Sequence, residues 1–464
     1  MDAPVTTALA RHITEAKNRP LSPEIADRAK QHLLDSLVAM ISGSTLRPGK
    51  LAIAYAESRG GTGESSIIGG TRTNPELAAF ANAMCAHADE TDDVNNRARI
   101  HPGASIVPAA VSIAEALDSR GSELLAAVSL GYDVAGAVNV GAWRTMEAMD
   151  QSPRTSHGLG QTFGAAAAAA FLSGLTMEQN RHVLSYSAQQ VAGISTIYRD
   201  PEHIGKAFTT AAHQAHAGVR SVELVRFGFT GVHDTFDKSP NVFDAFGEEG
   251  SVDRMLQDLD QTRHVTKTDI KQYPIGGPIQ PAAQALEHLI NTESLRADNV
   301  RSIEVRLPPF LAYIIKDRPM PDINLKYIMS ILLLEGRITF DNSHDYERFY
   351  SEPVKEIMSR VRVVGDPDLV PTDEYIAENG RAWRAIVTVE TRDGRTLTER
   401  VDACRGAGSN PISWDRLSTK AHMALLGIMT EGQIDDLIKW VQDVDTASST
   451  RDLTTFLATP TANG

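Results

Sequence analysis

Residues 22–44 read SPEIADRAKQHLLDSLVAMISGS, and their spacing predicts an amphipathic helix. Ser22 is a candidate N-cap and Gly43 is a candidate stop. One face of this helix would carry Ile25, Ala29, Leu33, Leu37 and Met40. Alanine-rich segments with the same period recur at 75–88, 104–117, 121–140, 162–173, 177–192 and 205–228. The sequence therefore predicts a closely packed helical bundle from about residue 5 to residue 265.

A different pattern begins near residue 270. The segments 301–309 (RSIEVRLPP) and 359–364 (SRVRVV) alternate apolar and polar residues, which predicts strands. Within 382–403 the pair Asp393-Gly394 predicts a β-hairpin. The stretch 415–444 returns to helical spacing and is expected to rejoin the first domain. The Ser-, Thr- and Ala-rich end of the chain is expected to be loosely held.

The composition favours a globular protein that binds neither nucleic acid nor membranes. Of 464 residues, 42% are apolar, and 45 basic against 59 acidic residues give a net charge of -14. The first twenty residues contain no continuous apolar segment, and the nearly apolar run 163–175 is shorter than the roughly 18 residues that span a bilayer. Cys85 and Cys404 fit no zinc or redox spacing. We expect a cytoplasmic protein.

The stretch 87–108, HADETDDVNNRARIHPGASIVP, is unusually polar for a segment that follows an apolar helix. If that helix continues over 75–94, His87 and Glu90 lie on one face, and Ser105 can cap the next helix. A histidine and a carboxylate beside a helix N-terminus predict an acid/base pair with a local anion site. The alternative is a solvated helix end. An EF-hand is excluded because Val94 stands where the loop needs glycine.

Other polar residues next to glycines are candidates for the same site. The sequence has no GxSxG elbow, no Walker A motif and no strand-linked GxGxxG. The remaining polar candidates are Arg154 and His157 in SPRTSHGLG; Arg199, Asp200, His203 and Lys206 in YRDPEHIGKAF; and Lys271 and Tyr273 in IKQYPIGGPIQ. Each alone is more typical of a structural residue, but together they need a common explanation.

These segments occur in an order that resembles the MmgE/PrpD family, whose members include 2-methylcitrate dehydratase, cis-aconitate decarboxylase and iminodisuccinate epimerase. The resemblance rests on AKQHLLDSLVAMISGS, GGTGESSIIGG, AAFANAMCAHADETDD, HPGASIVPAA, GYDVAGAV, TFGAAAAAAFLSGLT, HIGKAFTTAAHQAHAGV with GFTG, IKQYPIGGPIQ and YIMSILLLEGRIT. It implies a mainly α fold in which an all-helical domain is built from both chain ends and an α+β lid is inserted. We expect the helical domain at 1–268, the lid at 269–408, C-terminal helices at 409–455 and a flexible tail at 456–464.

The resemblance also implies roles for individual residues. His101 and His157 match histidines implicated in proton transfer, Glu90 stands where the family has an active-site aspartate, and Lys271 matches a lysine that faces the substrate carboxylates. The predicted substrate-binding residues are Asp93, Arg199, His203, Lys206, Tyr273 and Tyr327. The chain departs from the family pattern at Glu90, Val94, Asp200 and Gly276. Asp200 replaces a frequent lysine, and an added anion beside a polycarboxylate would disfavour binding.

The implied activity is that of a cofactor-independent lyase that holds no metal. We expect a hydro-lyase that acts on a small hydroxy di- or tricarboxylate such as 2-methylcitrate. His101 would move the proton at carbon, His157 would act as the opposite acid, and Glu90 would orient His101. An epimerase or isomerase, a decarboxylase, or a catalytically silent carboxylate-binding or scaffold protein are the alternatives. The family resemblance further implies a homodimer formed through the helical domain.

Overall fold

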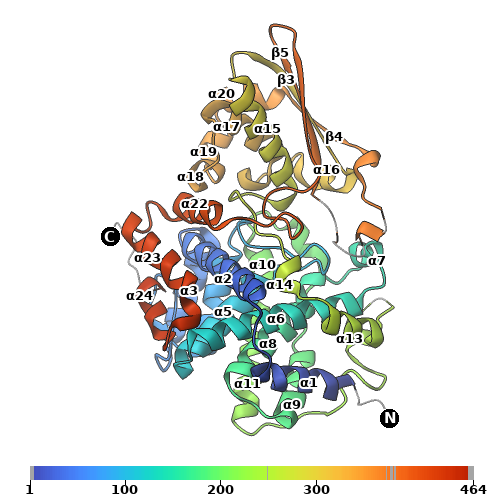
Figure 1. Cartoon of the computed structure of the whole chain (residues 1–464), viewed down its shortest axis with the longest axis vertical. Coiled ribbons are helices and arrows are strands. Elements are labelled where there is room, and N and C mark those ends of the chain that lie inside the picture. The colour runs from blue at the N-terminus through green and yellow to red at the C-terminus, as the bar shows by residue number, and fades with distance from the viewer. Residues whose placement is uncertain (1–4, 248, 373, 377–379, 381–382, 458–464) are drawn as a thin grey trace. The chain divides into compact units, whose positions relative to one another are not determined.

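The computed structural model describes residues 5–247, 249–372, 374–376, 380 and 383–457. The fold is mainly α, as predicted, and the chain divides into two compact units (Figure 1). The first unit contains Met1–Ala88, Asp92–Thr268 and Leu425–Gly464, and the second contains Asp89–Thr91 and Asp269–Ala424. The predicted boundary at 408 and the observed one at Ala424 differ by the helix α22 (Trp414–Leu425), most of which packs in the second unit.

The first unit is a helical bundle. Its longer helices are α1 (Val5–Glu15), α2 (Pro23–Gly43), α3 (Arg47–Arg59), α4 (Pro75–Ala86), α5 (Pro102–Leu117), α6 (Gly121–Ala142), α8 (Gly160–Leu172), α9 (Met177–Gln189), α11 (His213–Arg226), α13 (Val252–Gln261) and α23 (Glu431–Gln442). Shorter elements are β1 (Ser65–Ser66), β2 (Arg72–Thr73), α7 (Met146–Gln151), α10 (Ile204–Ala207), α12 (Val242–Phe246), α14 (His264–Lys267) and α24 (Thr454–Leu457). The tail was expected to begin at 456, but Phe456 and Leu457 end α24, and 458–464 lie outside the described residues.

Small residues let the central helices approach closely. A Cβ atom added at Gly131 of α6 would lie 3.0 Å from the carbonyl oxygen of Gly164 in α8, and α5 and α11 also pack against α8. By length and composition α6 could cross a membrane, but 89% of its most apolar window is buried. Such burial on all sides is typical of a core helix.

Local sequence signals predicted some helix ends correctly and missed others. The side chain of Ser22 accepts a hydrogen bond from the Ile25 amide, so the predicted N-cap of α2 is confirmed. The helix expected over 75–88 is present as α4, which ends at Ala86. It does not continue to 94, because Asp89 accepts the Thr91 amide in a tight turn. Ser105 is not a cap, since α5 already begins at Pro102, a residue favoured in the first helical turn.

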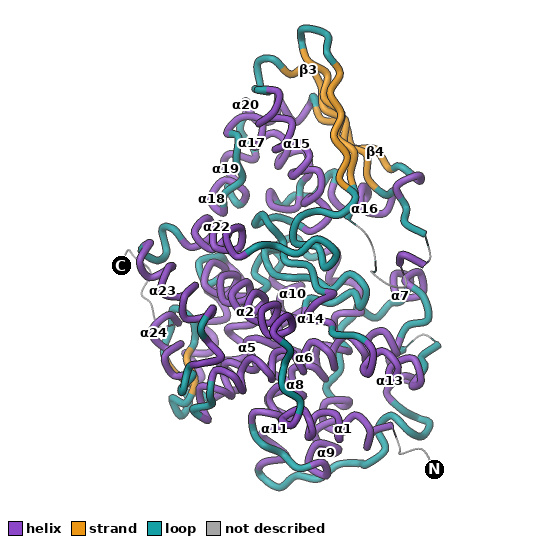
Figure 2. Tube along the Cα trace, viewed as in Figure 1, coloured by secondary structure: helices purple, strands orange, loops and turns teal. Residues whose placement is uncertain are grey.

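The second unit combines helices with a mixed sheet. Its described elements are α15 (Gln280–Glu293), β3 (Val300–Leu307), α16 (Pro309–Ile315), α17 (Leu325–Glu335), α18 (Phe340–Ser343), α19 (Tyr346–Phe349), α20 (Glu352–Ser359), β4 (Val361–Gly365), β5 (Ala385–Thr391), β6 (Thr396–Val401) and α22. The strand order is β4-β3-β5-β6, with β3 parallel to β4 and antiparallel to β5. Figure 2 shows the strands of this unit in orange. Helix α15 packs on β5 and β6, and α17 packs on α15 and β4. The predicted hairpin is confirmed, with Gly394 in its turn at φ 92°.

Candidate active site

A carboxylate shared by two histidines forms the centre of the candidate site in the first unit. His87 is the C-cap of α4 and His101 is the N-cap of α5, so the loop between the two helices brings both imidazoles together. Oδ2 of Asp92, in that loop, lies 3.0 Å from Nδ1 of His87 and 3.0 Å from Nδ1 of His101. All three side chains are buried. An ionised carboxylate only accepts hydrogen bonds, so each Nδ1 would carry the proton that it donates to Asp92.

Two further histidines extend this centre into a continuous group. The ring centroids of His87 and His101 are 4.7 Å apart, His203 lies 5.0 Å from His87, and His157 lies 5.3 Å from His101. His157 belongs to the short helix η2 (Ser156–Gly158), and His203 directly precedes α10. We call His87, Asp92, His101, His157 and His203 the histidine cluster. The cluster therefore joins residues from three separate segments of the first unit.

His157 is neutral at physiological pH. Burial, followed by the positive charges of His101, Lys206 and Arg99, holds its pKa well below the ordinary value. Its Nε2 lies 3.4 Å from the hydroxyl of Tyr198. Among the residues that the structure describes, Nδ1 of His157 and Nε2 of His87 have no hydrogen-bond partner. Buried polar atoms are usually satisfied, so these two nitrogens mark positions where a ligand or water would bind.

Cations lie beside the cluster. Arg99 is hydrogen-bonded to Tyr198; burial lowers the pKa of its guanidinium, an effect that Tyr198 partly offsets. Lys206, in α10, acts electrostatically on His157. A site with two cations is suited to a small anion that carries more than one carboxylate.

The backbone around the cluster adopts uncommon conformations. Arg99 and His203 have φ values of 55° and 62°, a left-handed region in which non-glycine residues are rare. Phe208–Ala212, labelled η4, is a π-helical turn that follows α10. Strained residues and π-helical turns concentrate at functional sites. This geometry is an independent reason to place the site here.

Asp93 is placed differently from the other predicted residues. One of its oxygens, Oδ2, lies 2.7 Å from Nδ1 of His32 and accepts the hydroxyl of Tyr132 at 2.6 Å. The other oxygen, Oδ1, accepts the amide of Gly103 at 2.9 Å. Its carboxylate therefore fastens α2, α5 and α6 to the loop after α4. This geometry favours a structural role for Asp93 rather than the predicted contact with substrate.

The structure accounts differently for Arg199 and Asp200. Arg199 ends the short helix η3 (Ser195–Arg199), and its side chain is exposed. The oxygens of Asp200 accept the backbone amides of Glu202 at 3.1 Å and Lys206 at 3.0 Å. Asp200 thus stabilises the turn that leads into α10. The anion that replaces the expected lysine is compensated by backbone donors.

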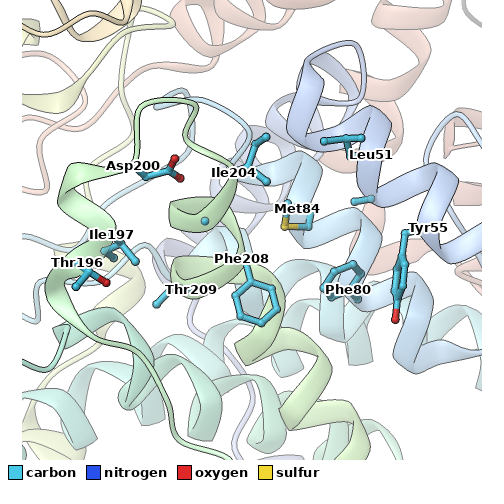
Figure 3. Close-up of a pocket in the computed structure, with 12 residues that line it drawn as sticks. Leu51, Tyr55, Phe80, Met84, Thr196, Ile197, Asp200, Ile204, Phe208 and Thr209 are labelled. Carbon is cyan, nitrogen blue, oxygen red and sulfur yellow. The ribbon is translucent and has the colours of Figure 1, made fainter.

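Asp200 also lines an apolar groove on the first unit, shown in Figure 3. The groove has a volume of about 550 Å³. Figure 3 shows Phe80, Met84 and Phe208 between Asp200 on one side and Tyr55 on the other. Among the residues that line this groove none is basic, and none belongs to the histidine cluster. The groove is therefore not suited to a polycarboxylate.

In the second unit, two buried lysines hold the tripeptide Asp89–Thr91. Nζ of Lys271 donates to the carbonyl oxygen of Glu90 at 2.7 Å and lies 3.6 Å from its carboxylate. Nζ of Lys420, in α22, donates to the carbonyl oxygen of Thr91 at 2.9 Å. Consecutive carbonyl groups thus bind lysines from opposite ends of the second unit's sequence. Lys271 was predicted as a site residue; Lys420 was not.

A buried ion pair lies beside the same tripeptide. Nε2 of His344 is 2.9 Å from Oδ2 of Asp89, and its Nδ1 is 2.8 Å from the Phe340 carbonyl oxygen. Burial alone would lower the pKa of His344, but Asp89 and Asp322 raise it to about 9. Burial raises the pKa of Asp322 to about 6. His344 is therefore an imidazolium at neutral pH.

The remaining predicted residues of the second unit have structural partners. The hydroxyl of Tyr327 donates to the Asn342 carbonyl oxygen at 2.5 Å. The hydroxyl of Tyr273 donates to Glu287 at 2.8 Å, and burial raises its pKa above the ordinary value. Both phenols stabilise the packing of the second unit. Neither geometry tests the predicted contact with substrate.

Sequence reasoning missed residues that the structure brings into the site. His87 and Asp92 were in the polar stretch that drew attention, but the role of orienting His101 was given to Glu90 instead of Asp92. The spacing of Asp92 and His101 contained no signal, because the loop between them determines their contact. Arg99 and Tyr198 had no sequence signal at all.

Comparisons with known proteins identify the family of this chain. Residues 7–255 match the MmgE/PrpD N-terminal domain, and residues 273–445 match the MmgE/PrpD C-terminal domain. The chain is 26% identical to the cis-aconitate decarboxylases of Homo sapiens and Mus musculus, covering 98% of this chain and 95% and 94% of theirs. It is 23% identical to the cis-aconitate decarboxylase-like protein oryM of Aspergillus oryzae, covering 98% of this chain and 97% of that protein. The chain belongs to the MmgE/PrpD family.

Proposed function

We propose that the protein is a cofactor-independent lyase that acts on a small di- or tricarboxylate by moving a proton at a carbon next to a carboxylate. The observation that carries this proposal is the contact of Asp92 with both His87 and His101. A carboxylate on Nδ1 fixes the tautomer of an imidazole and stabilises the imidazolium that forms when Nε2 takes up a proton. His101 is therefore the group that exchanges a proton with substrate.

His157 has a different task from the one that the sequence suggested. An acid must hold a proton before the reaction begins, but the depressed pKa of His157 keeps this imidazole neutral in the resting protein. A neutral imidazole donates a hydrogen bond to an oxygen that gains charge. His157 would thus stabilise the leaving or enolate oxygen, while His101 carries the proton from one atom to the other.

Substrate carboxylates would bind the cations. Arg99 and Lys206 serve this purpose in the first unit, beside His157. The family resemblance assigns a further carboxylate contact to Lys271. The ammonium group of this lysine already lies 3.6 Å from the carboxylate of Glu90. A lysine beside a carboxylate binds an added anion less strongly than an isolated lysine does. The substrate should therefore carry two or three carboxylates and no further negatively charged group.

Two reactions fit these roles. In a dehydration, His101 takes the proton from carbon, the carbon–oxygen bond breaks, and the same proton converts the departing hydroxide into water. In a decarboxylation, the bond between the carbon and a carboxylate breaks, carbon dioxide leaves, and the electron pair stays on the carbon. His101, which has first taken up a proton from solvent on Nε2, then transfers that proton to the carbon. The hydro-lyase is our first candidate, and the cis-aconitate decarboxylases that resemble this chain over 98% of its length support the second. An epimerase would use the proton transfer alone.

Product analysis separates these reactions. Purified protein is incubated with hydroxy, unsaturated and amino di- and tricarboxylates, and products are followed by proton NMR and by carbon dioxide release. A new alkene from a hydroxy acid identifies the hydro-lyase, and carbon dioxide with one carboxylate fewer identifies the decarboxylase. Unchanged substrates, with binding demonstrated by calorimetry, would contradict a lyase and favour a silent carboxylate-binding or scaffold protein.

We also propose that the protein is a cytoplasmic homodimer without nucleic-acid or membrane partners. Exposed apolar side chains on the first unit support self-association; among them are Leu51, Tyr55 and Phe208, which line the apolar groove. Exposed apolar groups of this kind are typical of protein interfaces. Sedimentation velocity gives the mass of the assembly, and a monomer at micromolar concentration would contradict the dimer.

A further inference from the structure

We propose a binding site for a divalent transition-metal ion such as Zn²⁺, formed by Glu178, His182 and His233 on the first unit. Glu178 and His182 are one helical turn apart on α9, and His233 lies in the segment that follows α11. The potential ligand atoms of these three side chains lie within 4.8 Å of one another. Two imidazoles and one carboxylate are a ligand set that Zn²⁺ accepts, with water in a fourth position.

The distances require little movement for metal binding. Oε1 of Glu178 is 3.3 Å from Nδ1 of His233 and 4.0 Å from Nε2 of His182. Ligand bonds of about 2.0–2.2 Å in a tetrahedral site put donor atoms roughly 3.3–3.5 Å apart. One of the two distances already has this value. The other needs a shift of under about 1 Å, which the half-exposed side chain of Glu178 can make.

Neighbouring groups orient the side chains of His182 and Glu178 and hold the backbone of His233. Nδ1 of His182 lies 3.1 Å from the carbonyl oxygen of Gly231 and 3.1 Å from its amide nitrogen, so Nε2 remains directed toward Glu178. Arg181 approaches Oε2 of Glu178 at 3.4 Å, leaving Oε1 toward the histidines. The guanidinium of Arg181 also donates to the His233 carbonyl oxygen at 3.2 Å. Such outer contacts are a regular feature of metal sites.

The site is separate from the catalytic proposal. It uses none of the residues of the histidine cluster, and it joins α9 to the segment after Phe229. A bound ion would fasten this segment to the helix and stabilise the folded protein by mass action. The positive charge of Arg181 opposes binding, which favours a moderate affinity over a permanently held ion.

Metal titration of the intact protein tests the proposal. Chelator-treated protein is titrated with Zn²⁺ by calorimetry, and the absorption of Co²⁺ is recorded as a second probe. We expect binding of one equivalent, a tetrahedral Co²⁺ spectrum and a higher melting temperature with Zn²⁺. His233→Ala and Glu178→Gln should each weaken binding by about tenfold or more, and His233→Ala should abolish the thermal shift. His288→Ala is the matched control, because His288 is an exposed histidine 3.9 Å from a single glutamate, Glu399.

Two results would overturn the proposal. The first is an absence of Zn²⁺ binding to the wild-type protein. The second is binding that His233→Ala leaves intact and that His101→Ala abolishes, because the ion would then occupy the histidine cluster. Circular dichroism of each variant verifies that the fold is retained.

Discussion

Nδ1 of His101 lies 3.0 Å from Oδ2 of Asp92. The next residue, Asp93, is equally buried but binds His32, Tyr132 and the amide of Gly103. Two adjacent carboxylates thus have different partners and different tasks. Asp92 prepares a histidine for proton transfer, and Asp93 stabilises the bundle that holds the histidine. This difference gives a matched pair of variants for the next two predictions.

Asp92→Asn should reduce kcat strongly and leave the fold intact. The amide can donate to Nδ1, which selects the wrong tautomer of His101, and it no longer stabilises the imidazolium. We expect kcat to fall by about 10²–10⁴-fold, with a much smaller change in KM. Steady-state kinetics on the substrate found by product analysis measure both constants. Retention of wild-type kcat would exclude a role of Asp92 in proton transfer.

Asp93→Asn should mainly reduce stability. The variant weakens the buried hydrogen bonds that Asp93 accepts from Tyr132 and from the Gly103 amide, and a buried donor left unsatisfied costs about 1–3 kcal/mol. Denaturant unfolding should show a lower free energy of unfolding, while kcat at a permissive temperature stays within a few-fold of wild type. If Asp93→Asn lost activity without losing stability, the structural role would be wrong.

The sequence predicted the helices better than the site because helix signals are local. Ser22 caps α2 through a residue three positions away, and the apolar period reports burial within one segment. The partners of Glu90 and Thr91 are Lys271 and Lys420, which are 181 and 329 residues away along the chain. No periodicity contains that information. The tripeptide Asp89–Thr91 was consequently expected in the helical domain, 1–268, and not in the second unit.

The site shows the same limit. The family resemblance identified four residues of the site, because they lie in segments that match the family pattern: His101, His157, His203 and Lys206. Asp92 was overlooked as a catalytic group since four carboxylates follow His87 within six positions. Their sequence order does not show which of them turns toward an imidazole. Only the loop geometry separates Asp92 from Asp89 and Asp93.

The ion pair of His344 with Asp89 should make stability depend on pH. The folded pKa of His344, about 9, is above the value of 6.5 in an unfolded chain. Its contribution is therefore complete below about pH 6.5 and is lost as the pH rises through about 9. The shift corresponds to at most about 3 kcal/mol. Calorimetric melting between pH 6 and pH 10 measures this loss.

His344→Gln is the control for that pH dependence. The variant should be less stable than wild type at pH 6, and the gap should narrow toward pH 10. Asp322, whose folded pKa is about 6, also affects stability, but its proton is lost as the pH rises from about 4 to about 6. This range lies below the one in which His344 titrates, so the two effects can be distinguished. A melting temperature of wild type that stays constant from pH 6.5 to pH 9 would contradict the charged state of His344.

Lys271 and Lys420 form a second matched pair. Both are buried and donate to consecutive carbonyl groups, but the proposed function gives only Lys271 a substrate contact. Lys271→Met should reduce kcat/KM by about a hundredfold or more, and Lys420→Met should chiefly lower the melting temperature. Equal losses of kcat/KM in both variants would mean that Lys271 acts only by holding the tripeptide.

Deuterium incorporation from heavy water tests proton transfer by His101 most directly. Wild-type protein, Asp92→Asn and His101→Ala are incubated in heavy water with the carboxylate that the product analysis identifies, and proton NMR follows the carbon next to its carboxylate. The account predicts deuterium at that carbon with wild-type protein and at least about a hundredfold slower incorporation with both variants. Incorporation at the wild-type rate by His101→Ala would contradict it.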